Sequence, residues 1–490
     1  MKRWRRPGGS ALAAVVLVLA AAAPATAEGA DEAVRDWIES RVPEQMREAK
    51  MPGFAIAVVR DGEKIYAEGF GARDLERNLP VTADTLFGIG SVTKSFVAIS
   101  ILQLQEAGKL SIEDPVGDHV PLELGRPGEP IRIRHFLTHT PGFPNLATSS
   151  ILIRRGLGEP TGVPMASAAD FYRFVNGATD EVLFAPGEHY FYNNAAWRML
   201  GHVVQEVSGV PFHRYLEEHV IRPLGMARTT LDTATLMADP DHLTPYRNGP
   251  EGPRPASFPY PNPDDNPGFS FLAGAGGISS SVNEMTLYLQ ALIDGGAHAG
   301  GRLVSAEAMA AMQSLQFRQE DGYFGAQGYG YGLAVVSDFL GHKQVGHGGS
   351  IAVSTAHMAF VPERRIGVVM MGNSSGMRYG FIADSLLALL LGHDPEDGAP
   401  GEAIRERMSA LAGSYATYRS IETLEVTERG GMLFLGGGEN ARPLVPEDPT
   451  YETTRFHTLS RGLRSPVEFR VGDEGDVRLL LGRYVYHRQP

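Results

Sequence analysis

The sequence contains no cysteine among its 490 residues. This absence excludes disulfides, a catalytic or metal-binding thiolate, an iron–sulfur cluster and a cysteine-linked lipid. Long apolar runs are also missing, and beyond the first 27 residues no stretch is long enough to suggest a transmembrane helix. Positive charge is scarce, since 44 Lys and Arg stand against 57 Asp and Glu and give a formal net charge of −13. Such an acidic chain has no electrostatic basis for binding nucleic acid.

The first 27 residues have the pattern of a secretory signal peptide. Four cations within residues 2–6 precede an apolar run at 11–23, and Ala-Thr-Ala at 25–27 matches a cleavage site. The apolar run is short for a membrane span, and a retained N-terminal anchor is the alternative. Cleavage after residue 27 would remove those four cations and no acid, which leaves a charge of −17. We therefore expect a secreted or periplasmic protein that has no membrane partner after cleavage.

The remaining chain divides into two domains that differ in composition and in the pattern of their predicted elements. Residues 28–393 contain an Asp-Gly hairpin near the start, a run of helices, and four antiparallel strands within 331–371. This order predicts an α/β domain with an antiparallel sheet, flanking helices and a helical insert. Residues 394–403 begin as a Pro- and Gly-rich linker, and residues 404–490 form a second domain that opens with a short helix and continues from 411 in short alternating strands. The second domain is therefore predicted to be a small antiparallel β-barrel or sandwich.

Hydrophobic periodicity locates the main elements of the first domain. The pattern predicts a long surface loop over the proline-rich residues 245–268. Strands are predicted at 54–60, 64–69, 331–336, 343–347, 356–361 and 366–371, and helices at 33–49, 92–107, 168–176, 194–208, 212–219, 282–294 and 380–391.

The motif Ser91-Val92-Thr93-Lys94 opens one of these predicted helices. Ser91 lies in the first turn, and a lysine three residues later lies on the same helical face. Burial would lower the pKa of the Lys94 ammonium, which could then accept the serine proton. Two glycines before Ser91, Gly88 and Gly90, would permit the sharp turn that exposes a nucleophile. On its own the tetrapeptide also fits a helix-capping serine followed by a solvated lysine.

A serine–lysine pair needs a proton shuttle, an oxyanion hole and substrate-orienting groups. Of three Tyr-x-Asn triplets, two lie in or beside the proline-rich loop, at 246–248 and 260–262. The third, Tyr192-Asn193-Asn194, leads directly into a helix, which favours it because a helix start has fixed geometry. Of two His-x-Gly triplets, 298–300 lies in a turn, whereas His347-Gly348-Gly349 lies on a predicted strand that a substrate backbone could approach.

Together these motifs resemble the serine β-lactamase and penicillin-binding-protein superfamily, in its class C-like branch of esterases and D-peptidases. The three motifs occur in the family's order. Supporting segments are Phe87–Ser91, Gly108–Pro115 and Leu137–Gly142, and the resemblance covers roughly residues 30–391. The C-terminal domain resembles the lipocalin-like barrel appended to several such peptidases, with Leu411–Tyr415 as its opening.

The resemblance implies a role for each motif. Ser91 would be the nucleophile, Lys94 would hold or accept its proton, and Tyr192 would relay protons to the leaving group and activate water. Asn194, His347, Gly348 and Gly349 would bind substrate, and the backbone N–H groups of Ser91 and Ser350 would form the oxyanion hole. His139 is expected to hold the turn before Pro141.

One departure bears on the substrate. Penicillin-recognising members usually carry lysine where His347 stands, and histidine is mostly neutral at pH 7. We therefore expect an exported serine hydrolase that forms an acyl-enzyme on a D-residue-containing peptide or amide, peptidoglycan-derived fragments among them, or on a small ester. It would need no cofactor or metal. The alternatives are a β-lactamase or penicillin-binding DD-peptidase, and a non-catalytic cell-wall-binding protein.

Overall fold

The computed structural model describes residues 27–489, apart from 260–264, 266, 439–440, 449–452, 461–462 and 473–475. The predicted signal peptide therefore lies outside the described residues, except for Ala27 at the start of the first helix. Within the described part of the chain, no helix combines the length and apolar character that crossing a bilayer requires.

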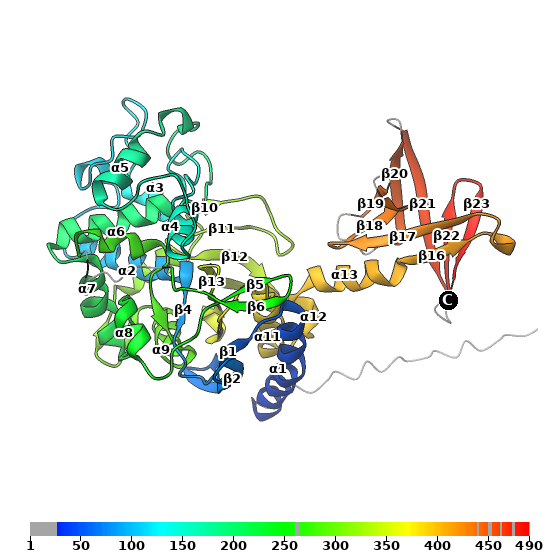
Figure 1. Ribbon diagram of the computed structural model, residues 1–490, viewed down its shortest axis with the longest axis horizontal. Helices are drawn as coiled ribbons and strands as arrows, with labels where there is room; N and C mark the ends of the chain where they lie inside the picture. Colours follow the sequence, from blue (N-terminus) through cyan, green and yellow to red (C-terminus); the bar gives the residue numbers. More distant parts are fainter. Residues whose placement is uncertain are drawn as a thin grey trace, which may run out of the picture.

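The larger part of the molecule is built around one antiparallel sheet (Figure 1). The N-terminal strand β1 lies inside the sheet next to the last strand of this domain, β15. The two pair in register from Phe54↔Gly372 to Arg60↔Ile366. In sheet order the strands are β10 (Phe317–Arg318), β11 (Gln327–Tyr329), β12 (Ala334–Phe339), β13 (His342–Ser350), β14 (Thr355–Val361), β15 (Ile366–Gly372), β1 (Gly53–Arg60), β2 (Glu63–Asp74) and β3 (Leu79–Pro80).

Helices cover both faces of this sheet. Alternate residues of β1 enter opposite cores: Ala55 and Ala57 pack with α2, α6 and α9, whereas Phe54, Ile56 and Val58 pack with α1 and α11. The helices are α1 (Ala27–Ala49), α2 (Thr93–Glu106), α3 (Ile133–Leu137), α4 (Thr148–Gly156), α5 (Ala168–Asn176), α6 (Asn194–Ser208), α7 (Phe212–Leu216), α8 (Thr233–Ala238), α9 (Val282–Ile293), α10 (Ala306–Met312) and α11 (Tyr379–Leu391).

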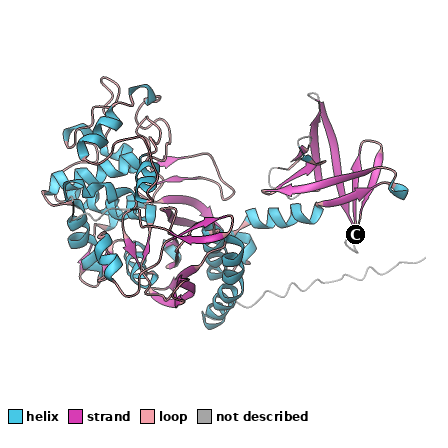
Figure 2. Cartoon of the chain, in the orientation of Figure 1, coloured by secondary structure: helices cyan, strands magenta, loops and turns pink. Residues whose placement is uncertain are grey.

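A closed antiparallel barrel follows the sheet domain and stands apart from it, joined by helix α13 (Figures 1 and 2). The barrel closes because its first strand pairs with its last, with Tyr415 opposite Arg488. Met408 and Leu411 of α13 pack against its core. The segment comprises α12 (Pro395–Gly398), α13 (Pro400–Leu411), β16 (Gly413–Ala416), β17 (Thr423–Arg429), β18 (Met432–Leu435), β19 (Arg442–Pro446), β20 (Arg455–Ser460), β21 (Leu463–Val471), β22 (Val477–Leu481) and β23 (Tyr484–Arg488).

The predicted fold class is confirmed: an α/β domain with an antiparallel sheet and flanking helices precedes an antiparallel β-barrel. Two local predictions are wrong. The strand expected from residue 331 begins at Ala334, because Gly332 has φ +77°, a left-handed conformation that interrupts an extended strand. The loop expected at 245–268 contains a hairpin of β5 (Tyr246–Gly249) and β6 (Gly252–Pro255). Prolines and glycines interrupt the apolar pattern of this hairpin, so hydrophobic periodicity did not predict its strands.

Candidate active site

Ser91 lies at a sharp turn between a short strand and a helix. Strand β4 (Phe87–Gly88) pairs with β7 (Ser279–Ser280), and the short helix η1 (Gly90–Val92) then leads into α2. Gly90 makes the turn with φ +52°, and a β-carbon at this position would lie 2.5 Å from the backbone nitrogen of Ser350. The turn leaves the Ser91 side chain half-buried, whereas its neighbours on both sides are buried.

Lys94 is fully buried one turn after Ser91, and three oxygens surround its amine. Its Nζ lies 2.8 Å from Ser91 Oγ, 2.8 Å from Asn194 Oδ1 and 2.9 Å from the carbonyl oxygen of Ala275. Burial, with a smaller contribution from the Arg198 guanidinium, holds the pKa of Lys94 well below its usual value. The amide and carbonyl oxygens can only accept hydrogen bonds, so a neutral amine would donate to both and direct its lone pair at the Ser91 hydroxyl. This arrangement can take up the serine proton.

The Tyr-Asn-Asn motif lies at the start of α6, opposite Lys94. Asn193 caps this helix, because its side-chain oxygen accepts a hydrogen bond from the Ala196 N–H at 3.1 Å. The cap holds the residues on both sides of it: Asn194 reaches Lys94, and the Tyr192 ring lies with its centroid 4.8 Å from Lys94 Nζ. The two sequence motifs, 100 residues apart, therefore meet at the Lys94 amine.

The third motif brings strand β13 against the Ser91 turn. A β-carbon on Gly349 would collide with the Ile89 carbonyl oxygen and would lie 2.6 Å from the Ser91 nitrogen. Only glycine permits this approach. Together with Gly90, it places the backbone nitrogens of Ser91 and Ser350 on facing segments.

His347 uses both of its ring nitrogens within the protein. Nδ1 lies 2.5 Å from the Gly348 carbonyl oxygen, and the Tyr329 hydroxyl lies 2.8 Å from Nε2. The carbonyl can only accept, so Nδ1 carries the proton and Nε2 accepts from Tyr329. Burial, followed by the charge of Lys94, lowers the pKa of His347 to about 3. The imidazole is therefore neutral across the physiological range. The sequence did not single out Tyr329, which is a single residue on a three-residue strand.

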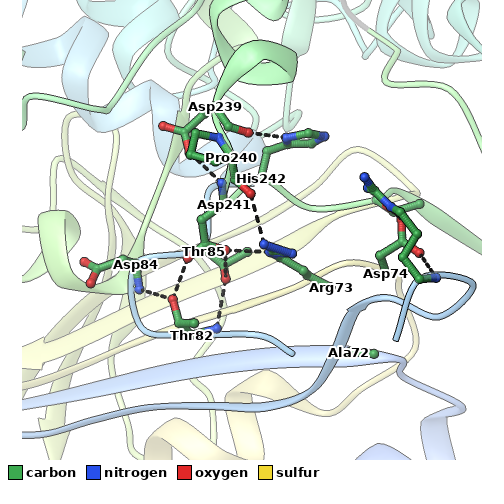
Figure 3. A network of polar contacts seen from close by, with 12 residues as sticks. Ala72, Arg73, Asp74, Thr82, Asp84, Thr85, Asp239, Pro240, Asp241 and His242 are labelled. Atoms are coloured by element: carbon green, nitrogen blue, oxygen red, sulfur yellow. Dashed lines mark hydrogen bonds and ion pairs between the residues drawn. The ribbon is translucent and has the colours of Figure 1, made fainter. Parts of the chain in front are cut away.

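A polar network fixes the chain that leads into the Ser91 turn (Figure 3). The Asp241 carboxylate accepts hydrogen bonds from Arg73 Nε at 2.7 Å, Thr82 Oγ1 at 2.7 Å and Thr85 Oγ1 at 2.6 Å. The Asp241 carbonyl accepts from the backbone N–H of Leu86 at 2.9 Å, immediately before β4. These contacts tie β2, the approach to β4 and the 239–242 segment together. No motif indicated them, because they join residues more than 150 positions apart.

The rival motifs lie elsewhere. Tyr246 is in the β5–β6 hairpin, where its hydroxyl accepts a hydrogen bond from the Leu75 N–H at 2.7 Å. His298 ends the two-residue strand β8 (Ala297–His298), which pairs with β9 (Gly301–Arg302). The triplet at 260–262 lies outside the described residues. Among the residues that the structure does describe, no three His, Asp or Glu side chains gather as ligands of a metal would.

The geometry defines a class of protein, one in which a serine and a buried lysine on one helix face a tyrosine from a helical insert and a glycine-rich strand edge. Comparison with known families agrees: residues 38–392 match the Beta-lactamase family. The chain belongs to this family, as its motifs indicated. Residues 395–487 match the Pab87 octamerisation domain.

Known proteins resemble the chain to different extents. The octameric penicillin-binding protein homologue from Pyrococcus abyssi has a TM-score of 0.83 and 34% identity, and the match covers 93% of this chain and 100% of that one. Protein flp of Staphylococcus aureus (strain MW2) is 28% identical over 39% of this chain and 37% of its own length. The PbpX protein of Bacillus subtilis (strain 168) is 29% identical over 52% of this chain and 58% of its own. This chain thus spans under two thirds of the length of these two curated relatives.

Proposed function

We propose that this protein is a serine hydrolase that forms an acyl-enzyme on Ser91. The observation that carries the proposal is the buried Lys94 amine, which lies 2.8 Å from Ser91 Oγ between two oxygens that can only accept. Neutral Lys94 takes the hydroxyl proton as Ser91 Oγ attacks the substrate carbonyl, and the N–H groups of Ser91 and Ser350 stabilise the oxyanion. Tyr192, beside Lys94, then passes a proton to the leaving group and later activates water.

The substrate we favour is a D-residue-containing peptide or amide, peptidoglycan-derived fragments among them, or a small ester. The neutral side chain of His347 supports this choice over a β-lactam. A penicillin carries a carboxylate, and the neutral imidazole of His347, with both nitrogens already bonded, offers it no charge. Penicillin binding or hydrolysis is the second candidate, and its support is the name of the Pyrococcus abyssi relative, a penicillin-binding protein homologue.

A paired labelling experiment separates these candidates. Full-length protein is treated with a fluorescent fluorophosphonate or with a fluorescent penicillin, then denatured and tested for covalent label. We expect fluorophosphonate labelling and slow or no penicillin labelling. Rapid labelling by both would favour the penicillin-binding alternative. Labelling by neither would leave a non-catalytic cell-wall-binding protein as the better account.

We also propose that the chain assembles with copies of itself through its barrel. Seven of the twelve large apolar side chains that are exposed among the described residues lie in the barrel, with Tyr418, Ile421 and Leu463 more than 70% exposed. Contiguous exposed apolar surface usually marks an interaction site. The match to an octamerisation domain and the octameric relative support a homo-oligomer. Export, to the periplasm or the medium, is proposed from the N-terminal pattern alone.

A further inference from the structure

His139 contacts three consecutive residues, Phe191, Tyr192 and Asn193, the last two of which belong to the Tyr-Asn-Asn motif. Its carbonyl oxygen accepts a hydrogen bond from the Phe191 N–H at 2.8 Å, and its Nδ1 accepts from the Asn193 N–H at 2.7 Å. Between these two bonds, the imidazole stacks on the Tyr192 ring with centroids 4.2 Å apart and planes 28° from parallel. The His139 side chain therefore contacts the Tyr192 ring and the backbone after it, and the His139 backbone carbonyl binds the residue before it.

We infer that His139 is the positioning residue for Tyr192: it fixes where the phenol stands relative to Lys94 and Ser91. The inference rests on the proposed function, in which Tyr192 moves protons. Proton transfer requires the phenol within hydrogen-bond reach of its partners, and a displacement of about 1 Å can lower a rate by about a hundredfold. The imidazole contacts the Tyr192 ring and the adjoining Asn193 backbone, so it acts through Tyr192.

His139 makes these contacts from an unfavourable backbone conformation. His139 has φ +60°, a left-handed conformation in which a histidine is uncommon, and its side chain is fully buried. The surroundings hold it there: the imidazole packs against the Trp197 indole with ring centroids 5.7 Å apart and against Tyr329, edge-on, at 4.7 Å. Strained residues in well-packed surroundings are often found at functional sites.

The imidazole is suited to this place because it stays neutral. Nδ1 accepts from the Asn193 N–H, so the single proton of the neutral ring lies on Nε2, and a second proton on Nδ1 would face a donor instead of an acceptor. Burial, followed by the charges of Lys94 and His347, holds the pKa of His139 well below its usual value. A flat, uncharged ring can therefore stack on Tyr192 without adding a second cation beside Lys94.

The motif does not depend on His139 for its fold. The Asn193 amide donates to the carbonyl oxygens of Phe143 and Pro144, both at 3.1 Å, and its oxygen caps α6. These bonds would hold the backbone of the turn after the imidazole is removed. His139→Asn is the sharpest variant, because asparagine tolerates the left-handed conformation and can still accept from the Asn193 N–H, but offers no ring for Tyr192.

The test is a double-mutant cycle on p-nitrophenyl acetate, a small ester, with the full-length protein. We expect His139→Asn to lower kcat by about ten- to a hundredfold with KM within about threefold, since positioning affects the reaction rather than binding. In a Tyr192→Phe background the same change should lower kcat by less than about threefold, because no phenol remains to be positioned. His202→Asn, which removes an imidazole stacked on Phe271 at 4.2 Å farther along α6, is the matched control and should stay near wild type.

Effects that multiply in the cycle would overturn the inference, because His139 would then act independently of Tyr192. A His139→Asn protein with wild-type kcat would overturn it as well. If that variant does not fold, as judged by circular dichroism, His139→Gln makes the same comparison. The proposed function fails separately: if Tyr192→Phe alone retains wild-type kcat, Tyr192 moves no proton, whatever His139 does.

Discussion

At the residue scale, the proposed catalysis depends on the charge state of Lys94. An amine that is buried, and that lies near the Arg198 guanidinium, loses its proton more easily than one in water. The neutral form that serves as base is populated above the lowered pKa and disappears below it. The acid–base chemistry is therefore set by burial, which a sequence motif cannot display.

The first prediction concerns this base. The rate of fluorophosphonate labelling should rise as the pH increases through the lowered pKa of Lys94 and should level off well below pH 10. Lys94→Arg should reduce the rate at least about a hundredfold, because a guanidinium stays charged and cannot act as a base. Rates measured from pH 5 to 10 on both proteins decide this. A rate that still climbs at pH 10, or an active Lys94→Arg protein, contradicts the role.

The second prediction concerns His347. Its pKa of about 3 keeps it neutral at pH 5, so acylation by a fluorescent penicillin should not accelerate between pH 7 and pH 5. His347→Lys should acylate about tenfold faster or more, since a hydrogen bond to a charged group contributes about 1.5–3 kcal/mol. His347→Gln is the uncharged control and should show no gain. Acceleration at pH 5 in the wild type that His347→Gln abolishes would mean that the imidazole is protonated and faces the ligand.

At the element scale, the site depends on how closely β13 approaches the Ser91 turn. Two glycines make the contact, Gly90 with its positive φ and Gly349 against the Ile89 carbonyl. Side chains at either position would force the two segments apart. The backbone N–H groups that are proposed to stabilise the oxyanion would then separate.

Gly349→Ala should therefore impair catalysis more than folding. We expect a loss in kcat on p-nitrophenyl acetate of about a hundredfold or more, the usual effect of losing one oxyanion donor. Gly348→Ala is the matched control, because a β-carbon there would lie 3.2 Å from His357 Nδ1 and would touch no part of the Ser91 turn. Equal losses in the two variants would refute the close approach as the source of the effect.

The elements that the sequence predicted well are those with regular apolar periods. Helix α5 (168–176) and α6 (194–208) were predicted with the bounds that the structure has, and the β1–β2 hairpin was marked by Asp61-Gly62. In the barrel, alternation predicts strands at 424–428, 432–435, 468–471, 477–481 and 484–486 but not β19 and β20, because β19 contains two prolines and β20 mixes charged and apolar residues. Helix α13 begins inside the predicted linker, at Pro400, since proline suits the first turn of a helix as well as a linker.

The sequence also identified the residues that meet at Lys94 but not the groups that orient them. Motif order placed Ser91, Lys94 and Tyr192 together. It assigned His139 to a turn and gave no sign of its stacking on Tyr192, because the two are 53 positions apart and their pairing has no local pattern. Likewise, the hydrogen bond from Tyr329 to His347 arises from the pairing of strands in the sheet.

At the scale of the whole molecule, the barrel is held at a distance by α13 (Figure 1). Arg378, before α11, pairs with Glu402 of α13 and with Glu48 of α1, which links the connecting helix to the sheet domain. Such a connection can hold the barrels of several copies in a fixed relation to their sheet domains. The exposed apolar residues at the barrel's hairpin ends would supply the contacts.

The corresponding prediction is that Ile421→Asp breaks the assembly and spares the active site. Ile421 is 76% exposed, and a carboxylate buried in an interface without a partner is strongly unfavourable. Light scattering should show a smaller species with unchanged fluorophosphonate labelling per chain. Leu183→Asp, at a 54% exposed position of the sheet domain, is the control and should leave the mass unchanged. A wild-type protein that is monomeric at every concentration would contradict the proposal.

Ser91 is proposed to be the nucleophile that forms the acyl-enzyme, and peptide mapping identifies which residue reacts with a serine-directed reagent. Full-length protein is treated with a fluorophosphonate, digested and analysed by mass spectrometry. We predict one added phosphonyl group per chain, located on Ser91, and no adduct in Ser91→Ala that retains the wild-type circular dichroism. An adduct on another residue, or labelling that persists in Ser91→Ala, would contradict the account.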